Sequence, residues 1–236
     1  MLSSRILYQN KACIVINKLK GEAAQAAKTN HSVLKDGIVN LPKELRKILD
    51  TNNEIVQAAH RIDVPVTGCV LFALTKKALG FLNRVFAGDY DIPAEKQYWA
   101  IVEKPLNLPD KSGELKHWID INEKHNKSFI YDTDGPGRKK ASLKYRIIGE
   151  GTNYLFLEVE LLSGRHHQIR AQLAAIGLYI KGDVKYGARR SEKTGGIRLH
   201  ARSLSFPNPL NPKEKILVKA DPPEMDNLWQ GFMETV

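Results

Sequence analysis

Cysteine is scarce in this sequence: only Cys13 and Cys69 occur among 236 residues, and both lie in apolar stretches. A disulfide framework or a cysteine zinc clamp needs more cysteines at short spacings, so we predict two buried free thiols. No run reaches the roughly 18 apolar residues that cross a membrane, or the core of a signal peptide. A glycine-rich phosphate loop and a dinucleotide fingerprint are absent as well. These absences predict a cytoplasmic protein that uses no small-molecule cofactor and no membrane.

Charge, by contrast, is plentiful and unbalanced. Lysine and arginine number 36 against 26 aspartates and glutamates, which gives a net charge of +10 and a pI near 9.5. A basic surface attracts polyanions, and phosphate neutralisation is the main source of sequence-independent affinity for nucleic acid. Acidic membrane surfaces are the other polyanion to consider, but no strongly amphipathic basic helix stands out. The charge therefore makes nucleic acid a candidate partner, and a basic protein that binds no particular polyanion is an equally good interpretation of the charge alone.

The pattern of apolar residues predicts an α+β fold with a mainly antiparallel sheet. We expect strands at 12–16, 55–59, 68–74, 97–102, 142–148, 154–162, 199–206 and 215–218. We expect helices at 42–49, between Thr75 and Gly88, at 165–176, and around Leu228 and Trp229 near the C-terminus. Residues 19–40 read as irregular or lightly helical, and residues 111–140 as polar with a turn at 134–137. No repeat or linker divides the chain, so we predict one catalytic domain, 1–236.

Residues 60–68 form the first segment whose polar residues a structural role explains poorly. Arg61 and Asp63 flank an isoleucine at the end of a predicted strand, just before Pro65. The proline stiffens the segment, which suits a side chain presented to a substrate. A turn held by the aspartate side chain is the alternative, and this segment taken alone favours that alternative.

Residues 164–170 form the second segment, placed at the expected start of a helix. The helix N-terminus and Arg165 together favour an anion, either a phosphate or a carboxylate. The adjacent His166 and His167 invite a zinc interpretation, but helical neighbours point about 100° apart and no cysteine or glutamate partner is nearby. We predict no metal site, and for His167 a role in packing or in facing RNA.

Residues 95–100 form the third segment, an aromatic strand. Side chains alternate across a strand, so Tyr98 and Trp99 must face opposite ways, one into the core and the other toward a cleft. An aromatic face offered to a base contributes about 1–3 kcal/mol by stacking. Two ordinary half-buried aromatics are an equally good interpretation of this segment by itself.

Taken together, these segments resemble the RluA-type pseudouridine synthases, which modify ribosomal and transfer RNA. The matching motifs follow the family's order over nearly the whole chain, and several motifs in order are far more specific than one. The resemblance rests on residues 7–8, 14–18, 60–63 with 67–68, 98–100, 164–170, 182–187 and 199–201.

The resemblance implies a role for each of five residues. Asp63 would be the catalytic aspartate, and Arg165 the partner that pairs with it. Tyr98 would stack on the target base, Arg61 would help to displace the uridine from its stacked position, and Leu199 would cover the uracil. The fold implied is the pseudouridine-synthase fold, with a mixed, mainly antiparallel central sheet and a central catalytic cleft.

The sequence departs from the family pattern at a few positions. Residues 19–21 stand where a proline and a glycine are common, Val64 follows the aspartate in place of a polar residue, Thr67 replaces a frequent serine, and His166 a frequent threonine. None of these changes removes a group that the chemistry needs. The chain also begins close to the first motif, so we expect a form that lacks a separate N-terminal RNA-binding domain.

The predicted function is therefore RNA pseudouridine synthase, an isomerase that acts on a specific uridine of rRNA or tRNA after base flipping. Isomerisation consumes no ATP and needs no redox cofactor, in keeping with the missing nucleotide motifs. Two alternatives stay open: a carboxylate-dependent nucleic-acid glycosylase, and a non-catalytic basic RNA-binding factor. The sequence does not identify the RNA, the target uridine, the base that removes the C5 proton or the oligomeric state, for which a monomer is assumed.

Overall fold

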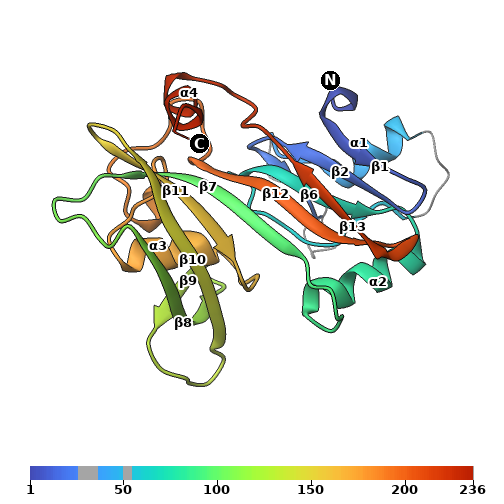
Figure 1. Cartoon of the computed structure of the whole chain (residues 1–236), viewed down its shortest axis with the longest axis horizontal. Coiled ribbons are helices and arrows are strands. Elements are labelled where there is room, and N and C mark those ends of the chain that lie inside the picture. The colour runs from blue at the N-terminus through green and yellow to red at the C-terminus, as the bar shows by residue number, and fades with distance from the viewer. Residues whose placement is uncertain (26–36, 50–54, 236) are drawn as a thin grey trace. The chain divides into compact units, whose positions relative to one another are not determined.

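The computed structural model describes residues 1–25, 37–49 and 55–235, and shows an α+β protein in which strands predominate (Figure 1). These residues form four α-helices and thirteen strands. Most of the strand pairs are antiparallel, and the short pair β3 (Glu22–Ala23) with β4 (Val39–Asn40) is parallel. The predicted fold class is confirmed. The segment predicted to be irregular, 19–40, lies partly outside the described residues.

The chain divides into two compact units. Unit 1 comprises Met1–Glu95 and Ala201–Pro223, and unit 2 comprises Lys96–His200 and Glu224–Val236. Each unit therefore combines a long stretch of sequence with a short returning segment. The assignment of residues 1–236 to one catalytic domain stays a prediction.

The sheet of unit 1 contains long-range antiparallel pairs. In strand order it contains β1 (Ile6–Gln9), β2 (Cys13–Lys18), β6 (Thr67–Ala73) and β12 (Leu199–Asn208), with β13 (Asn211–Lys219) paired to β12 and β5 (Gln57–Ala58) paired to β6. The core is formed by the buried side chains of these strands and of α2. Both cysteines belong to it, as predicted, and burial raises the pKa of each thiol to about 12.

The helices of unit 1 begin and end where the sequence indicates. In α2 (Lys76–Ala87) the Thr75 side chain accepts a hydrogen bond from the Ala78 amide, and Gly88 ends the helix with a left-handed φ of 87°. In α1 (Leu41–Ile48) Asn40 is the N-cap and Pro42 lies in the first turn. These are local signals, since a short polar side chain caps orphan amides and glycine tolerates positive φ.

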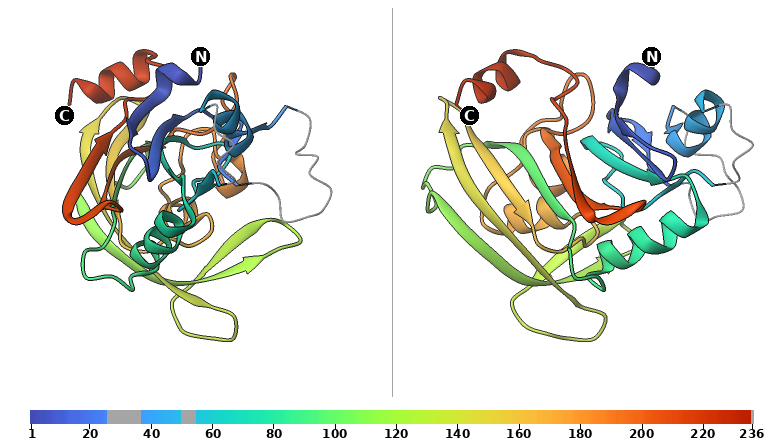
Figure 2. Two further views of the ribbon diagram at one scale, coloured as in Figure 1. Left: turned by 90° about the vertical axis from the view of Figure 1, so that its right-hand side faces the viewer. Right: turned by 45° about the vertical axis from the view of Figure 1, so that its right-hand side comes forward.

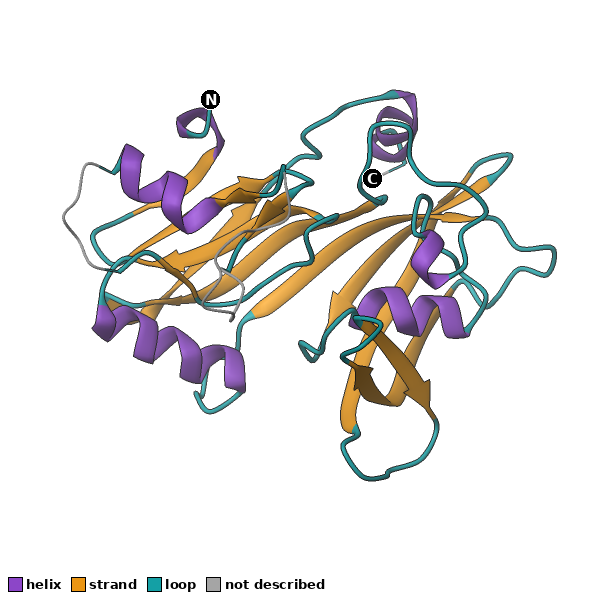
Figure 3. Cartoon of the chain, turned by 180° about the vertical axis from the view of Figure 1, so that it is seen from behind, coloured by secondary structure: helices purple, strands orange, loops and turns teal. Residues whose placement is uncertain are grey.

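Unit 2 is built on a second run of strands, in the order β7 (Glu95–Glu103), β11 (Tyr154–Leu161), β10 (Lys139–Glu150), β8 (Ser112–Asn122) and β9 (Lys127–Tyr131). The predicted hairpin is confirmed as β10 and β11. The unit also contains the helices α3 (Gln168–Ala175) and α4 (Asn227–Met233) and the 3-10 turn Val184–Tyr186. Figure 3 shows α3 beside the strands of this unit.

The two faces of the unit 2 sheet carry different helices. Directly opposite residues on neighbouring strands share a face, so Tyr98, Val159 and Tyr145 point the same way. The α3 helix packs on this face, where Gln172 contacts His117. The other face carries an aromatic cluster formed by Trp99 and Phe156 of the sheet and by Trp229 and Phe232 of α4.

Two sequence predictions are wrong in this unit. Residues 111–140 were expected to contain only a polar segment with a turn, but they contain β8 and β9. β8 pairs with β10 and β9 pairs with β8, and these pairs supply hydrogen bonds that the local pattern does not reveal. The helix expected at 165–176 begins instead at Gln168, because His167 adopts a left-handed backbone with φ of 50°. Among the described residues, no helix is long and apolar enough to cross a membrane.

Candidate active site

The predicted catalytic aspartate lies in the loop between β5 and β6 of unit 1. Arg61 is exposed, Ile62 between the two polar residues is buried, and Asp63 is partly exposed. The backbone closes a turn in which the Val66 amide donates to the Asp63 carbonyl oxygen at 3.0 Å. The loop thus anchors its isoleucine and leaves Arg61 exposed. Its turn is closed by the backbone carbonyl of Asp63, whereas the structural alternative was a turn held by the Asp63 side chain.

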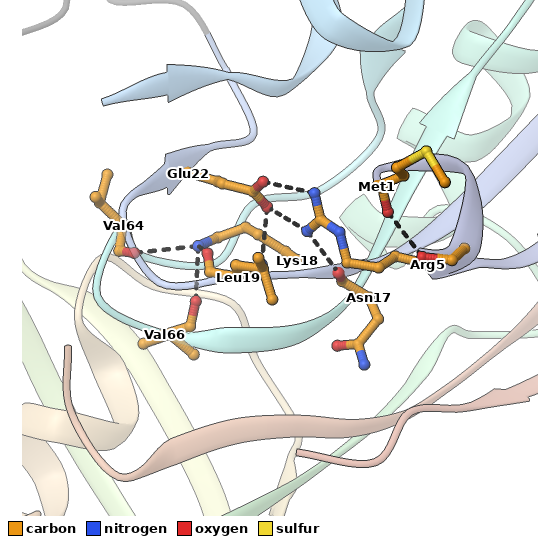
Figure 4. A network of polar contacts seen from close by, with 9 residues as sticks. Met1, Arg5, Asn17, Lys18, Leu19, Glu22, Val64 and Val66 are labelled. Carbon is orange, nitrogen blue, oxygen red and sulfur yellow. Dashed lines mark hydrogen bonds and ion pairs between the residues drawn. The ribbon is translucent and has the colours of Figure 1, made fainter. Parts of the chain in front are cut away.

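A buried lysine holds this loop in place. Lys18, the last residue of β2, is fully buried, and its ammonium donates hydrogen bonds to the carbonyl oxygens of Leu19 at 2.8 Å, Val64 at 3.1 Å and Val66 at 2.7 Å (Figure 4). The Gly21 amide also donates to the Val64 carbonyl oxygen, at 2.9 Å. The segment that follows Asp63 is therefore fixed by its backbone carbonyls.

An ion pair in the same network supports the lysine. The Glu22 carboxylate accepts two hydrogen bonds from the Arg5 guanidinium, at 2.7 and 2.8 Å, and one from the Leu19 amide. Arg5 also donates to the Asn17 carbonyl oxygen at 3.1 Å (Figure 4). A bidentate pair of this kind fixes geometry as well as charge, so the strand end that carries Lys18 is rigid.

Burial decides the acid–base behaviour of Lys18. Desolvation lowers its pKa to about 7, against the charges of Glu22 and Asp63, which raise it, and with a smaller lowering by Arg5. Only the ammonium has three N–H groups for the three carbonyl acceptors. The loop is therefore held by a charge that titrates near neutral pH.

Replacing Lys18 by methionine is expected to change how stability depends on pH. The unfolded chain keeps this proton up to about pH 10.4, whereas the folded chain releases it near pH 7. Between these values the unfolded state binds one more proton, so the Lys18 contribution makes the free energy of unfolding rise with pH, by a few kcal/mol at most. Urea unfolding across this range should show a steeper rise for the wild type than for Lys18→Met.

The control for this comparison is the exposed Lys43, whose replacement by methionine should leave the wild-type dependence on pH unchanged. Parallel curves for the wild type and Lys18→Met would show that Lys18 does not release its proton on folding near neutral pH. Lys18→Gln, which keeps a donor, serves the same comparison if the methionine variant fails to fold.

Gly68 follows the loop and allows the backbone of β12 to come close to β6. Its φ is +113°, and a Cβ atom there would lie 2.3 Å from the carbonyl oxygen of Ala201 on β12. A side chain at this position would push β12 away from β6. This glycine of the first motif is therefore structural.

Tyr98 lies on β7 in unit 2 and is buried, with 6% of its surface exposed. Its neighbour Trp99 faces the opposite way, into the cluster with Phe156 and Phe232, as the alternation predicted. Tyr98 shares its sheet face with Lys96, two residues earlier on the same strand. Its stacking on a base stays a prediction.

Arg165 lies before α3 rather than in its first turn, which corrects its predicted place at the helix start, and its binding of an anion stays a prediction. Its side chain is exposed, and its Nε donates to the Lys140 carbonyl oxygen at 2.9 Å. Gln168, the first helical residue, accepts from the Arg165 amide at 3.0 Å and from the Ser163 hydroxyl at 2.8 Å. The Gln168 side chain thus sets the path of the segment that presents Arg165.

The two adjacent histidines have structural partners. Their rings stack at 3.8 Å, so the helical geometry used to argue against a shared metal does not apply. His166 Nδ1 lies 2.9 Å from the Ser128 hydroxyl, and His167 Nδ1 lies 3.0 Å from the Tyr186 hydroxyl. His167 is buried, which confirms its packing role. In the part of the chain that the structure describes, no three His, Cys, Asp or Glu side chains form a group able to hold a metal ion.

Lys96 is a candidate site residue that the sequence analysis missed. Its Nζ lies 3.6 Å from the position that a Cβ atom on Gly164 would occupy. Burial lowers the pKa of Lys96, and the charge of Arg165 lowers it further. Two cations thus gather on the Tyr98 face, an arrangement that an anion would stabilise. The only sequence signal was the position of Lys96 two residues before Tyr98.

Leu199 begins β12 and is buried. The five predicted residues therefore fall into two sets: Arg61 and Asp63 in unit 1, and Tyr98, Arg165 and Leu199 in unit 2. A cavity of about 910 Å³ in unit 2 is lined by none of the five. The pairing of Asp63 with Arg165 stays a prediction.

A buried ion pair supports the segment that carries Arg165. Arg170 of α3 donates from Nε to Asp183 Oδ2 at 2.6 Å and from Nη2 to Oδ1 at 2.8 Å, and both side chains are almost fully buried. The Arg170 guanidinium also lies 4.9 Å from the centre of the Tyr186 ring. These contacts join two of the motifs, 164–170 and 182–187, and give the second a structural role.

Comparison with known proteins identifies the family. The family model described as RNA pseudouridylate synthase matches residues 12–175. An uncharacterized RNA pseudouridine synthase of Mycoplasma genitalium is 31% identical over 223 residues, covering 86% of this chain and 63% of that protein. Ribosomal large subunit pseudouridine synthase D of Zymomonas mobilis is 26% identical over 238 residues, covering 97% of this chain and 72% of that protein.

The fold is shared with a solved structure. Human RNA Pseudouridylate Synthase Domain Containing 4 has a TM-score of 0.71 and 21% identity, covering 99% of this chain and 93% of that chain. The chain spans less than two thirds of the length of several curated relatives, including the Mycoplasma genitalium protein at 63%. With a family match over most of its length, the chain belongs to the RNA pseudouridylate synthase family.

Proposed function

We propose that this protein isomerises a specific uridine of rRNA or tRNA to pseudouridine. The observation that carries the proposal is the family match over residues 12–175, which includes Asp63, Tyr98 and Arg165. The net charge of +10 supports an RNA substrate, because phosphate contacts dominate affinity for nucleic acid. Relatives named as ribosomal large subunit pseudouridine synthases make large-subunit rRNA the first substrate to test.

The reaction exchanges one bond for another within a single nucleotide. The C1′–N1 glycosidic bond breaks and a C1′–C5 bond forms, while C5 loses a proton and N1 gains one, so composition does not change. A carboxylate suits this chemistry because it can attack an anomeric carbon or stabilise its positive character. Asp63 can equally remove a sugar proton to give a glycal, or attack the uracil ring, and each route needs its ionised form.

The remaining residues bind and hold the nucleotide. A uridine stacked in RNA must be flipped out at a cost of a few kcal/mol, and the exposed Arg61 is placed to contribute phosphate contacts. Tyr98 stacks on the extruded base, and Leu199 covers it, so that the detached uracil turns without escaping. Arg165 pairs with the Asp63 carboxylate, because a guanidinium is the geometric and charge complement of a carboxylate. Lys96 adds positive charge beside Arg165.

The test is conversion of an rRNA or tRNA transcript by the purified chain. We expect pseudouridine at one position, with no change in the mass of the RNA. Release of uracil and an abasic sugar would instead identify a glycosylase, and binding without any conversion would identify a non-catalytic RNA-binding factor. Mapping pseudouridines in total RNA with and without the gene would then identify the target uridine.

A further inference from the structure

The strands at the edge of unit 2 carry aromatic side chains on their solvent face. We call this face of β8, β9 and the first part of β10 the arm face, and it contains Trp118, Phe129 and Tyr131. β9 is the last strand in the order of this sheet, and a turn at residues 132–138 joins it to β10 (Figure 2). Phe129 is 41% exposed, and the other two rings are partly exposed.

The strand register places these rings together. Trp118 lies directly opposite Tyr131 on one side and Lys140 on the other, and Phe129 lies opposite Asp120, two residues along from Trp118. Side chains at such positions share one face of the sheet. That face is not the one occupied by Tyr98 and α3, because Tyr145 lies opposite Gly113, and Gly113 and Trp118 have opposite orientations on β8.

A cation lies over each of the three rings. The Arg138 guanidinium is 3.6 Å from the centre of the Tyr131 ring, the Lys140 ammonium 5.2 Å from Trp118, and the Lys127 ammonium 5.8 Å from Phe129. Lys127 also lies 5.1 Å from Tyr186. Cation–π contacts of this kind stabilise the hairpin. They also place positive charges next to flat apolar rings.

The charge on this face is one-sided. Glu114 carries an ion pair with Lys116 at 3.1 Å, and one Asp120 oxygen accepts a hydrogen bond from the Ile121 amide. Lys144 is likewise paired with Glu160 of β11, at 3.6 Å. The cations that lie over the rings, Lys127, Arg138 and Lys140, are therefore the ones offered to an anion. An excess of cations around exposed aromatic rings complements a strand of bases and phosphates, since bases stack on rings and phosphates meet the charges.

We propose that the arm face binds a single-stranded RNA segment outside the target nucleotide. The choice of RNA rests on the proposed function, but the surface is a second contact on the opposite face of the sheet from Tyr98. Successive bases stack on Phe129, Tyr131 and Trp118, and Lys140 and Arg138 contact the phosphates between them. Stacking of this kind tolerates any base, so the face adds affinity without choosing the sequence.

Tryptophan fluorescence gives a direct readout of this contact. The sequence contains three tryptophans, and Trp99 and Trp229 are buried with 2% and 4% exposed surface, which leaves Trp118 accessible. We use a single-stranded oligoadenylate of about twelve nucleotides as the probe, because it contains no uridine and so reports on this face separately from the reaction. We expect it to quench Trp118 emission, with an affinity that falls as salt rises.

Variants on the face identify the groups responsible. Phe129→Ala and Tyr131→Ala should each lower the affinity for the oligoadenylate about tenfold. Lys140→Gln should lower the salt dependence of that affinity. Tyr179→Ala and Lys193→Gln, which remove an exposed ring and an exposed lysine elsewhere in unit 2, are the matched controls and should change neither value. Circular dichroism confirms that each variant is folded.

Absence of quenching, or quenching that Phe129→Ala and Tyr131→Ala leave unchanged, would overturn the proposal. A change in elution volume of Phe129→Ala on a sizing column would assign the face to contact with a second copy of this chain, which also overturns it. Quenching in a protein that makes no pseudouridine would refute the proposed function and leave this inference standing.

Discussion

Replacement of Asp63 by asparagine is expected to abolish turnover, with a loss of about 10⁴-fold or more, the range found when a principal catalytic group is removed. The amide has nearly the shape of the carboxylate but neither its charge nor its basicity, so each of the three routes is blocked. The fold should survive, because Lys18 holds the loop through the carbonyl oxygens of Val64 and Val66 and not through the Asp63 side chain alone. Single-turnover conversion of the RNA measures the loss of turnover, and thermal unfolding checks that the variant is folded.

Arg165 provides the second half of this prediction. Arg165→Met leaves Asp63 in place and should come close to the loss seen in Asp63→Asn, whereas Arg190→Met, which removes another exposed arginine of unit 2, should retain wild-type turnover. Near-normal kcat in Arg165→Met would refute the pairing. Wild-type kcat in Asp63→Asn would refute a catalytic role for the carboxylate.

Local signals account for what the sequence predicted correctly in the fold. The α2 helix is bounded by Thr75 and Gly88, two residues whose preferences depend on their own backbone geometry. The β10–β11 hairpin follows from alternating apolar residues around a glycine-rich turn. Such features need no knowledge of the rest of the chain, and the structure places them close to the predicted residues.

Tertiary contacts account for what the sequence could not predict. The start of α3 depends on the Gln168 side chain, which binds Ser163 and the Arg165 amide, and on the left-handed backbone of His167. Neither feature leaves a trace in apolar periodicity. β8 and β9 are polar strands whose existence depends on strand pairing, of β8 with β10 and of β9 with β8.

The candidate site shows the same division. The resemblance singled out Asp63, Tyr98 and Arg165 by motif, but the groups that hold them come from elsewhere in the chain. Lys18 supports the Asp63 loop by hydrogen bonds to Val64 and Val66, which lie 46 and 48 residues further along the sequence. Sequence spacing does not reveal that this lysine is fully buried, and burial is the main cause that lowers its pKa to about 7.

Asp183→Asn is expected to lower the free energy of unfolding by about 3–5 kcal/mol, the range for removing one partner of a buried ion pair. The asparagine keeps the size of the side chain, but it leaves the Arg170 guanidinium buried without a compensating charge. Urea unfolding at neutral pH measures the loss. The matched control is the exposed pair between Arg146 and Glu158, where Glu158→Gln should cost no more than about 1 kcal/mol.

The double variant Arg170→Met with Asp183→Leu separates the charge from the packing. If the cost of Asp183→Asn comes from an uncompensated buried charge, removing both charges and filling the space with apolar side chains should restore much of the stability. A double variant less stable than Asp183→Asn would assign the loss instead to hydrogen bonds and shape. Because Arg170 lies in the helix that follows Arg165, Asp183→Asn should also lower turnover under conditions where the protein remains folded. The double variant should regain more of the stability than of the turnover.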